Sequence, residues 1–260
     1  MEALSVVVIT YNEEKNIERC LRSVGGVADE IIIVDSYSTD STVEIARHFN
    51  AVIKQSRFDG YINQKNKAIN MAANDLVLLL DADEALSNEL RNSIMLVKSG
   101  RDHAAYSMNR CSYFMGKLIR RGLWYPDRKV RLFNKRNAVC GGMNPHDRII
   151  MHAKYPVKHL RGDLYHYTYD TLEEYLLRND VVSTIAAQSL FEAGIRRHWS
   201  KQILSPLWAF FNGYILRLGF LEGYEGLLIA IHTANQSFSK YQKLRRLYKH
   251  ASLKISESLG

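Results

Sequence analysis

The chain has 260 residues, of which 47% are hydrophobic and 24% charged, a composition typical of a folded protein with one large domain or one domain plus an extension. Its formal net charge of +8 predicts an anionic partner: nucleic acid, an acidic membrane face or a phosphorylated substrate. Cys20, Cys111 and Cys140 are widely spaced without a CxxC pair, which argues against a disulfide framework and a cysteine zinc site.

Neither a secretory signal nor a membrane span is expected. The first residues carry no basic region, and the apolar run 4–9 is too short for a signal sequence, so we expect a cytoplasmic protein. The two longest uncharged runs, 203–216 and 226–239, are shorter than the roughly 20 residues that a spanning helix needs. Such runs suit buried or interfacial helices.

Apolar runs and polar, helix-like segments alternate through the first hundred residues. The predicted strands are 4–10, 30–34, 51–54 and 76–80, and the predicted helices are 13–23, 39–48, 61–73 and 87–98. This alternation is typical of a parallel sheet built from βαβ units. Residues 41–44 have the spacing of a capping box, and Ser87 is a predicted N-cap.

The pattern changes twice after residue 100. Short β-like pieces at 104–108, 129–133 and 147–152, broken by Gly and Pro, predict mixed or antiparallel strands and long loops. Helical patterns dominate from residue 171 onward, so a domain boundary is predicted near residue 170.

Polar and acidic residues follow three of the predicted strands. In an open parallel sheet, ligands bind outside the carboxyl ends of the strands. These ends carry Thr10, Tyr11, Asn12 and Glu13 after the first strand, Asp35 after the second, and Asp81, Ala82 and Asp83 after the most apolar strand. The three clusters are therefore expected to converge on one edge.

A carboxylate cluster repels a diphosphate unless a cation lies between them. The chain has neither GxGxxG nor GxxxxGK, the glycine loops that hold phosphates with backbone amides. Alternation along a strand puts Asp81 and Asp83 on one side, where Mg²⁺ or Mn²⁺ would suit their oxygens. Alternatively, Asp81 is a turn residue, and Asp83 and Glu84 begin the next helix.

Three segments carry a resemblance to a known family. VVVITYNEE at 6–14, IIVDSYSTDST at 32–42 and LLLDADE at 78–84 resemble, in order and spacing, the motifs of family 2 glycosyltransferases. The resemblance is greatest to the bacterial lipopolysaccharide inner-core β-glucosyltransferases. It implies an α/β GT-A fold, Rossmann-like, with a mostly parallel central sheet and flanking helices. The catalytic domain would span 1–170, with a nucleotide-sugar half at 1–100 and an acceptor half at 101–170, and a helical extension would span 171–260.

The resemblance also implies donor and metal residues. Asn12, Glu13 and Asp35 would contact the uracil and ribose of a uridine diphosphate sugar, and Thr10 and Tyr11 would shape that pocket. Asp83 would be the main ligand of Mg²⁺ or Mn²⁺ within the triplet Asp81, Ala82 and Asp83, and Asp81 would lie near the ribose or the metal. Lys65 is a candidate phosphate contact or a solvated helix lysine. His166 is a candidate metal or diphosphate contact or a packed histidine.

Inverting transfer needs a carboxylate that removes the proton of the acceptor hydroxyl. The related enzymes carry a His-Glu pair in the second half of the domain, and here the pair is His146-Asp147. Asp147 is therefore the candidate base, with Glu84 and Asp127 as lesser candidates. Gly-Gly and Asn-Pro predict a flexible loop over 141–148, and a plain surface turn at Asp147 is the alternative.

The acceptor side is implied by resemblance alone. Trp124, Pro126, Arg131 and His146 match the acceptor segment, and Arg131 would pair with a phosphate or stand as an ordinary surface arginine. The implied reaction moves glucose from a UDP-sugar to the inner-core heptose of lipopolysaccharide. Another polysaccharide, a lipid carrier or a protein is the alternative acceptor.

The aromatic and basic region 196–249 predicts peripheral association with the anionic inner face of the bacterial cytoplasmic membrane. Packing on the catalytic domain, or a homo-oligomer contact through the tail, is the alternative. A nucleic-acid-binding or membrane-binding module without catalysis is the rival class, but nucleic-acid binding needs no acidic clusters at three strand ends. A nucleotidyltransferase would carry a glycine-rich, basic loop after the first strand, where this chain has Tyr11-Asn12-Glu13.

Overall fold

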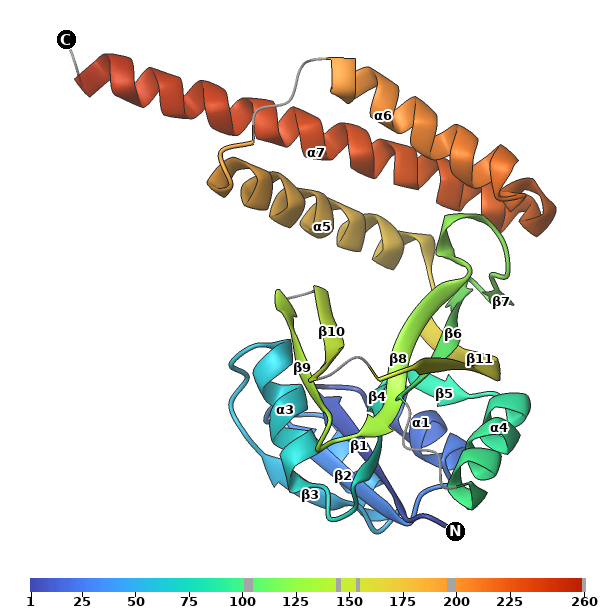
Figure 1. Ribbon diagram of the computed structural model, residues 1–260. Helices are drawn as coiled ribbons and strands as arrows, with labels where there is room; N and C mark the ends of the chain where they lie inside the picture. Colours follow the sequence, from blue (N-terminus) through green and yellow to red (C-terminus); the bar gives the residue numbers. More distant parts are fainter. Residues whose placement is uncertain (101–104, 144–145, 153–154, 196–199, 259–260) are drawn as a thin grey trace. The chain divides into compact units, whose positions relative to one another are not determined.

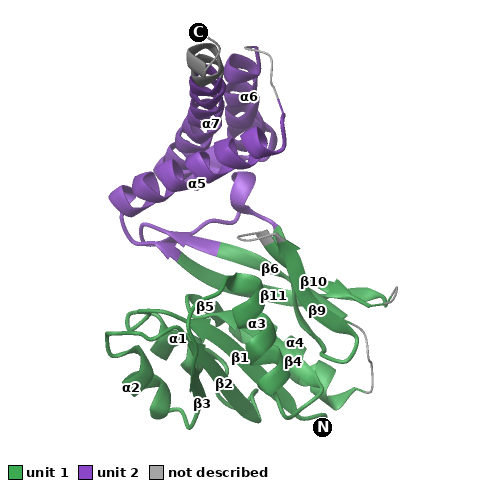
Figure 2. Ribbon diagram, turned by 90° about the vertical axis from the view of Figure 1, so that its left-hand side faces the viewer, with its two compact units in different colours: residues 1–111, 127–167 green, residues 112–126, 168–260 purple. Residues whose placement is uncertain are grey.

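The computed structural model describes residues 1–100, 105–143, 146–152, 155–195 and 200–258, without the side chains at 143, 146 and 252–258. The chain divides into two units, coloured separately in Figure 2. Unit 1 comprises Met1–Cys111 and Asp127–Tyr167, and unit 2 comprises Ser112–Pro126 and Thr168–Gly260. The helical unit therefore also takes an earlier segment of the chain, which the expected boundary near residue 170 does not include.

One mixed sheet runs through unit 1 (Figure 1). In the described residues its strand order is β3-β2-β1-β4-β8-β6-β11-β5, with β7 paired to β6. Strands β3, β2, β1 and β4 are parallel to one another. Strand β8 pairs antiparallel with both β4 and β6. The bounds are β1 Leu4–Thr10, β2 Glu30–Asp35, β3 Val52–Gln55, β4 Leu76–Asp81, β5 Glu84–Leu86, β6 Ala105–Phe114, β7 Lys117–Leu118, β8 Asp127–Asn134 and β11 Val157–Tyr169.

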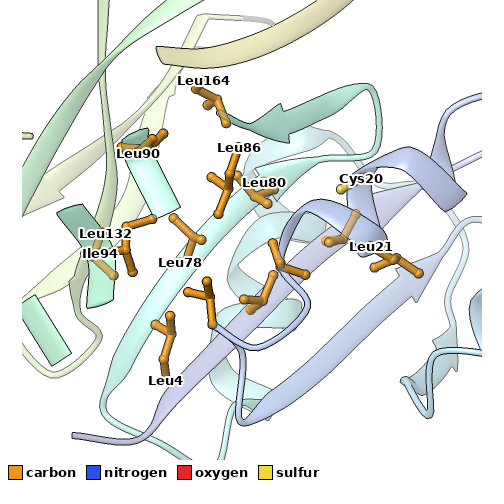
Figure 3. Packing of buried hydrophobic residues seen from close by; sticks show 14 of the residues in the cluster. Leu4, Cys20, Leu21, Leu78, Leu80, Leu86, Leu90, Ile94, Leu132 and Leu164 are labelled. Atoms are coloured by element: carbon orange, nitrogen blue, oxygen red, sulfur yellow. The ribbon is translucent and has the colours of Figure 1, made fainter. Parts of the chain in front are cut away.

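Alternate residues of β1 and β4 enter two different cores because side chains alternate along a strand. Leu4, Val6, Val8, Leu76, Leu78 and Leu80 pack in one cluster with helices α1 (Ile17–Ser23), α2 (Thr42–Arg47) and α4 (Asn88–Ser99), and Figure 3 shows part of this cluster. Val7, Val77 and Leu79 pack on the opposite face against helix α3 (Tyr61–Met71). Burial on both faces explains why these strands are apolar throughout.

One expected helix start, at Ser87, is confirmed, and two others differ from expectation. Ser87 is the N-cap of α4, and its Oγ accepts a hydrogen bond from the amide of Leu90 at 3.2 Å. The capping box expected at 41–44 is wrong, because Ser41 makes no side-chain cap. Asp40 instead accepts from the amide of Thr42 at 3.0 Å, so a neighbouring carboxylate satisfies the helix end. Helix α1 begins at Ile17 rather than at residue 13, after a turn.

The loop expected at 141–148 is mostly a β-hairpin, so that expectation is wrong. Strand β9 (Ala138–Met143) pairs antiparallel with β10 (His146–Met151), and residues 144 and 145 between them lie outside the described residues. Gly142 lies opposite Asp147 with a φ of +108°, which glycine adopts without strain. A side chain at Gly141 would approach Ile150 Cδ1 to 2.7 Å, so this glycine allows close cross-strand packing.

Unit 2 is built from helices around an aromatic core. Phe114 contacts Trp124 and Tyr175 edge-on, with ring centroids 5.4 and 5.2 Å apart. The elements are α5 Leu172–Glu192, α6 Ser200–Phe211, a π-helical turn η2 Asn212–Leu216, the 3₁₀ turns η1 Gly122–Trp124 and η3 Gly219–Glu222, and α7 Gly223–Ser258. No helix within the described residues has both the length and the apolar character to cross a bilayer.

Truncation at Leu78 tests the central core. Its side chain is fully buried in β4, so Leu78→Ala should lower the free energy of unfolding by about 2–5 kcal/mol through lost burial and a cavity. Urea-induced unfolding followed by circular dichroism measures the loss. Leu96→Ala, at a site 73% exposed on α4, is the matched control and should change stability by less than about 0.5 kcal/mol. Equal losses in the two variants would contradict the described core.

Candidate active site

The strand ends predicted to converge do so. In the parallel register, Thr10 lies beside Asp35, and Ile9 lies beside Asp81. Strand β1 therefore holds the ends of β2 and β4 on either side of its own end, at one edge of the sheet. This edge presents the acidic residues that the sequence singles out.

The loops after β1 and β2 are tied to each other. The amide of Asn12 donates to Ser38 Oγ at 2.9 Å, and the Asn12 side-chain oxygen accepts from the amide of Thr39 at 2.8 Å. Asp35 is fully buried and accepts from the amide of Ser38 at 3.0 Å. Asn12 has a φ of +53°, a left-handed conformation that asparagine tolerates better than most residues. Asn12 and Asp35 thus fix the shape of this loop pair.

Three further donor-side candidates lie on the same edge. Tyr11 is exposed, whereas the Thr10 hydroxyl is buried and has no hydrogen-bond partner among the described residues. Burial raises the pKa of the Glu13 carboxyl, Asn16 partly offsets this by hydrogen bonding, and the nearby Asp83 raises it further. The influence of Asp83 on Glu13 shows that the acidic ends of β1 and β4 sense each other electrostatically.

Asp81 lies between two largely buried cations. Its Oδ1 is 2.8 Å from Lys65 Nζ on α3, and its Oδ2 is 2.7 Å from Arg131 Nη2 on β8. The same Arg131 nitrogen lies 2.6 Å from Glu84 Oε1 in β5, and Glu84 is fully buried. These contacts form a continuous row of alternating charge across the carboxyl edge.

The pKa directions follow from this row. Burial alone would raise the pKa of Asp81, but Arg131 and Lys65 hold it well below its usual range. Burial would lower the pKa of Lys65, yet Asp81 and Asp147 raise it, and the same competition raises the pKa of Arg131 through Asp81 and Glu84. All three groups therefore stay ionised near neutral pH.

Asp147 joins the row from the β-hairpin. Its Oδ2 lies 2.9 Å from Lys65 Nζ, so one lysine bridges the candidate base and the first aspartate of the triplet. Cys140 Sγ, on the facing strand, is 3.8 Å from the same oxygen. Burial and then Asp147 raise the pKa of the Cys140 thiol to about 11, which keeps it protonated as a weak donor to that carboxylate.

Asp83 and His166 form a separate pair. Asp83 Oδ2 lies 3.2 Å from His166 Nε2, and both side chains are partly exposed. The backbone also joins the segments, since the amide of Tyr167 donates to the Asp83 carbonyl at 2.9 Å. Asp81, by contrast, uses both carboxylate oxygens in ion pairs in this conformation.

The donor set fits a divalent cation that arrives with a substrate. No three His, Cys, Asp or Glu side chains gather as a ready metal centre in the part of the chain that is described. Mg²⁺ and similar cations are often held by one or two carboxylates together with substrate phosphates and water. Asp83 supplies one such carboxylate at the sheet edge, and the His166 imidazole lies 3.2 Å from it, so these two residues are the candidates to hold the ion.

The acceptor-side candidates are divided between the two units. Arg131 is only 6% exposed and pairs with Asp81 and Glu84, so the alternative of an ordinary surface arginine is wrong, whereas its pairing with a phosphate stays a prediction. Trp124 lies in the aromatic core of unit 2. The side chain of His146 lies outside the described residues, although its backbone belongs to β10.

Several site residues escape the sequence patterns. Arg110 on β6 lies 3.7 Å from Glu84 and 2.7 Å from Asp127, extending the charge row. Asn66 exchanges two hydrogen bonds with the backbone of Cys140, which fastens the hairpin to α3. In the structure Gln64 and Lys65 are buried on α3, and such a polar helix face turned inward indicates a site, but this burial is not visible in the sequence.

The comparisons with known proteins extend along nearly the whole chain. The model of the family described as Glycosyl transferase family 2 matches residues 5–157. An uncharacterized glycosyltransferase of Rickettsia typhi is 30% identical over 257 residues, covering 95% of this chain and 88% of the relative. The lipopolysaccharide core biosynthesis glycosyltransferase LpsC of Rhizobium meliloti is 27% identical, covering 92% of this chain and 93% of the relative.

A solved structure supports the fold over the same span. The mannosyltransferase PcManGT of Pyrobaculum calidifontis, in complex with GDP-Man and Mn²⁺, aligns with 93% of this chain and 86% of its own, with a TM-score of 0.55 and 13% identity. At this identity the likeness concerns the fold alone. The α/β GT-A fold with a mostly parallel sheet, flanking helices and a helical C-terminal part is confirmed.

The buried charge row makes a stability prediction. Arg131→Met removes the cation between Asp81 and Glu84 and leaves both carboxylates without it, so the free energy of unfolding should fall by about 3–5 kcal/mol. Arg136→Met is the control, because Arg136 is 75% exposed in its pair with Asp75 and should matter by less than about 1 kcal/mol. Denaturant titration compares them, and similar losses would contradict a structural role for the row.

Proposed function

The chain belongs to glycosyl transferase family 2, and from that premise we propose that it transfers glucose, with inversion, from UDP-glucose to a heptose of a bacterial lipopolysaccharide inner core. The observation that carries the catalytic part is the Asp83–His166 pair at the end of β4, on the edge that also holds Asp35 and Glu13. The acceptor class is supported by the 27% identity with LpsC over nearly the full length of both chains.

The donor would bind along the ends of β1, β2 and β4. Asn12, Glu13 and Asp35 line the loops that would meet the uracil and ribose, and the exposed ring of Tyr11 offers a stacking surface. The buried Thr10 hydroxyl, without a partner among the described residues, is available to a ligand polar group. These polar groups suit a nucleoside better than a purely apolar ligand.

Asp83 and His166 would hold the cation that accompanies the diphosphate. When bound, Mg²⁺ or Mn²⁺ supplies positive charge against the leaving diphosphate. Lys65, whose pKa is raised by Asp81 and Asp147 against the effect of burial, stays cationic on the same edge and is a candidate contact for a phosphate oxygen. Asp81 orients Lys65 and Arg131 through its two carboxylate oxygens.

Asp147 is the most suitable of the three candidate bases. Glu84 is fully buried and ion-paired with Arg131, which leaves it no path to an acceptor hydroxyl. Asp127 pairs with two cations: burial would raise its pKa, but Arg110 and Lys129 lower it, whereas Asp147 pairs with Lys65. Asp147 keeps partial exposure and sits on a hairpin bonded to α3.

The proposed reaction is one displacement. The acceptor hydroxyl gives its proton to the Asp147 carboxylate while its oxygen forms a bond to the anomeric carbon of the sugar. The bond from that carbon to the diphosphate oxygen breaks at the same time, and UDP leaves with the electron pair. Attack on the face opposite the leaving group inverts the configuration.

Substitutions at Asp83 and Asp147 should separate donor binding from proton transfer. Asp147→Asn should lower transfer by roughly 10²–10⁴-fold, as expected for loss of a general base, while UDP affinity with manganese stays as in the wild type. Asp83→Asn should lose transfer together with the manganese dependence of UDP binding. Calorimetry with and without manganese and a UDP-release assay measure the two effects.

Glu18→Gln is the control for these variants, because Glu18 is 51% exposed and pairs with Arg22 on the same helix, α1. It should bind and transfer like the wild type. Wild-type behaviour in both Asp83→Asn and Asp147→Asn would overturn the assignment of the site.

Donor and acceptor identity call for a screen. UDP-glucose should release its nucleoside diphosphate faster than other UDP-hexoses or GDP-mannose release theirs when truncated core oligosaccharides ending in heptose are supplied. Preference for another polysaccharide, a lipid carrier or a protein acceptor would reject the heptose assignment while keeping the glycosyltransferase. Release of UDP independent of any acceptor would reject both.

A further inference from the structure

Unit 2 exposes a continuous run of large apolar side chains, here named the outer apolar face. Its members come from α6 and from the two turns that follow it in the chain. Each member is between 43% and 62% exposed: Ile203, Leu204, Leu207, Trp208, Phe211, Ile215, Leu216, Leu218, Phe220 and Leu221. Large exposed apolar surfaces are rare on monomeric soluble proteins and mark interaction sites.

The spacing of these residues explains their shared face on α6. Leu204 precedes Leu207 and Trp208 by three and four residues, and Phe211 follows them by four and three, which places all four on one side of a helix. The same residues, with Lys201 and Tyr241, line an open groove between α6 and α7. Trp208 and Phe211 have ring centroids 6.3 Å apart, so the aromatic rings are grouped.

The charge around this face is one-sided. Residues 200–250 contain seven Lys or Arg and only two Glu, and one of the seven, Lys243, pairs with Asp180 of α5 at 2.6 Å. Glu222 is buried and lies 3.3 Å from Lys117, and Glu225 lies 3.6 Å from the same lysine, so both carboxylates are compensated. Lys201 and Arg217 accompany the apolar side chains, and from Ser200 to Leu221 the sequence has no carboxylate. Any occupant of this face therefore meets apolar and cationic groups together.

We infer that the outer apolar face inserts into the surface of a bilayer rich in anionic lipid. Apolar and aromatic side chains reach the acyl region of such a surface, and adjacent Lys and Arg side chains meet its phosphate headgroups. A second copy of this chain fits less well, because a two-fold contact would bring the cationic borders of two identical faces together. A nucleic acid would match the cations but would leave ten large apolar side chains without a partner.

This inference deepens the proposed function and rests on it in one respect: a lipid-linked acceptor lies in a bilayer. It concerns α6 and the turns η2 and η3, whereas the donor chemistry concerns unit 1. The two therefore can fail separately.

The test is binding to vesicles by the full chain. Wild-type protein should sediment with vesicles of phosphatidylethanolamine and phosphatidylglycerol at low salt, and binding should weaken in pure phosphatidylcholine or at high salt. The double substitution L207D/W208D should reduce the partition coefficient by about tenfold or more, because it replaces two inserting side chains with carboxylates. An unchanged thermal unfolding curve of L207D/W208D would show that the two substitutions leave the fold intact.

The control places one new carboxylate elsewhere in unit 2. Leu177→Asp alters a leucine that is 72% exposed on α5, outside the outer apolar face, and should bind vesicles like the wild type. A further variant, K201E/R217E, keeps every apolar side chain and should lose the preference for phosphatidylglycerol. All three variants, L207D/W208D, Leu177→Asp and K201E/R217E, should transfer sugar to a delipidated oligosaccharide like the wild type.

The outcomes separate the possibilities. Absence of wild-type binding, or equal binding by L207D/W208D and the wild type, overturns the inference. A wild-type dimer in light scattering that L207D/W208D converts to monomer, with vesicle binding unchanged, overturns it in favour of a second copy. Vesicle binding as expected without any sugar transfer by the wild type retains the membrane face and rejects the proposed function.

Discussion

The compensation of buried charge at the carboxyl edge of the sheet is the constraint on which unit 1 depends. Glu84 is fully buried, and Asp81, Lys65 and Arg131 are largely so, at a cost of several kcal/mol for each ion left alone. Their mutual contacts offset this cost only if α3, β4, β5 and β8 hold their present places. The ion pairs therefore join the elements and also shape the edge at which we propose the donor binds.

Lys65 shows how stability and chemistry meet in one side chain. It comes from a helix on one face of the sheet, yet it contacts the end of β4 and the hairpin strand β10. Any movement of the hairpin that carries Asp147 away leaves Lys65 with Asp81 alone. The candidate base and the triplet are thus mechanically coupled through an ammonium group, and the two hydrogen bonds between Asn66 and Cys140 limit how far the hairpin can move. A site built on such contacts is preorganised before substrate arrives.

Much of unit 1 was predictable from sequence because its signals are local. The apolar strand 76–80 and the acidic residues after it are contiguous in the sequence. The parallel register then brings Asp35 beside Thr10 and Asp81 beside Ile9, on either side of the end of β1. The partners of Asp81 were not predictable in this way. Arg131 is 50 positions from Asp81, and no periodicity predicts an ion pair over that separation.

The hairpin was predicted as a loop because glycine pairs usually indicate loops. Here Gly141 allows close cross-strand packing, and Gly142 adopts a positive φ within a paired strand. The capping box at 41–44 failed because Asp40, outside the motif, was the better acceptor.

The net charge of the chain takes a different meaning once it is divided by region. Over the whole sequence, the formal net charge of +8 indicates a phosphorylated substrate and an acidic surface equally well. Five of those eight charges, however, lie in residues 200–250, and the cations of the donor edge are matched by carboxylates. The excess therefore belongs to unit 2, beside exposed tryptophan, phenylalanine and leucine, where a free diphosphate would find no enclosing polar site. A bilayer has an anionic surface that pairs with the cations and an apolar interior that takes up the exposed apolar side chains. A soluble anion matches only the cations, so a bilayer is favoured.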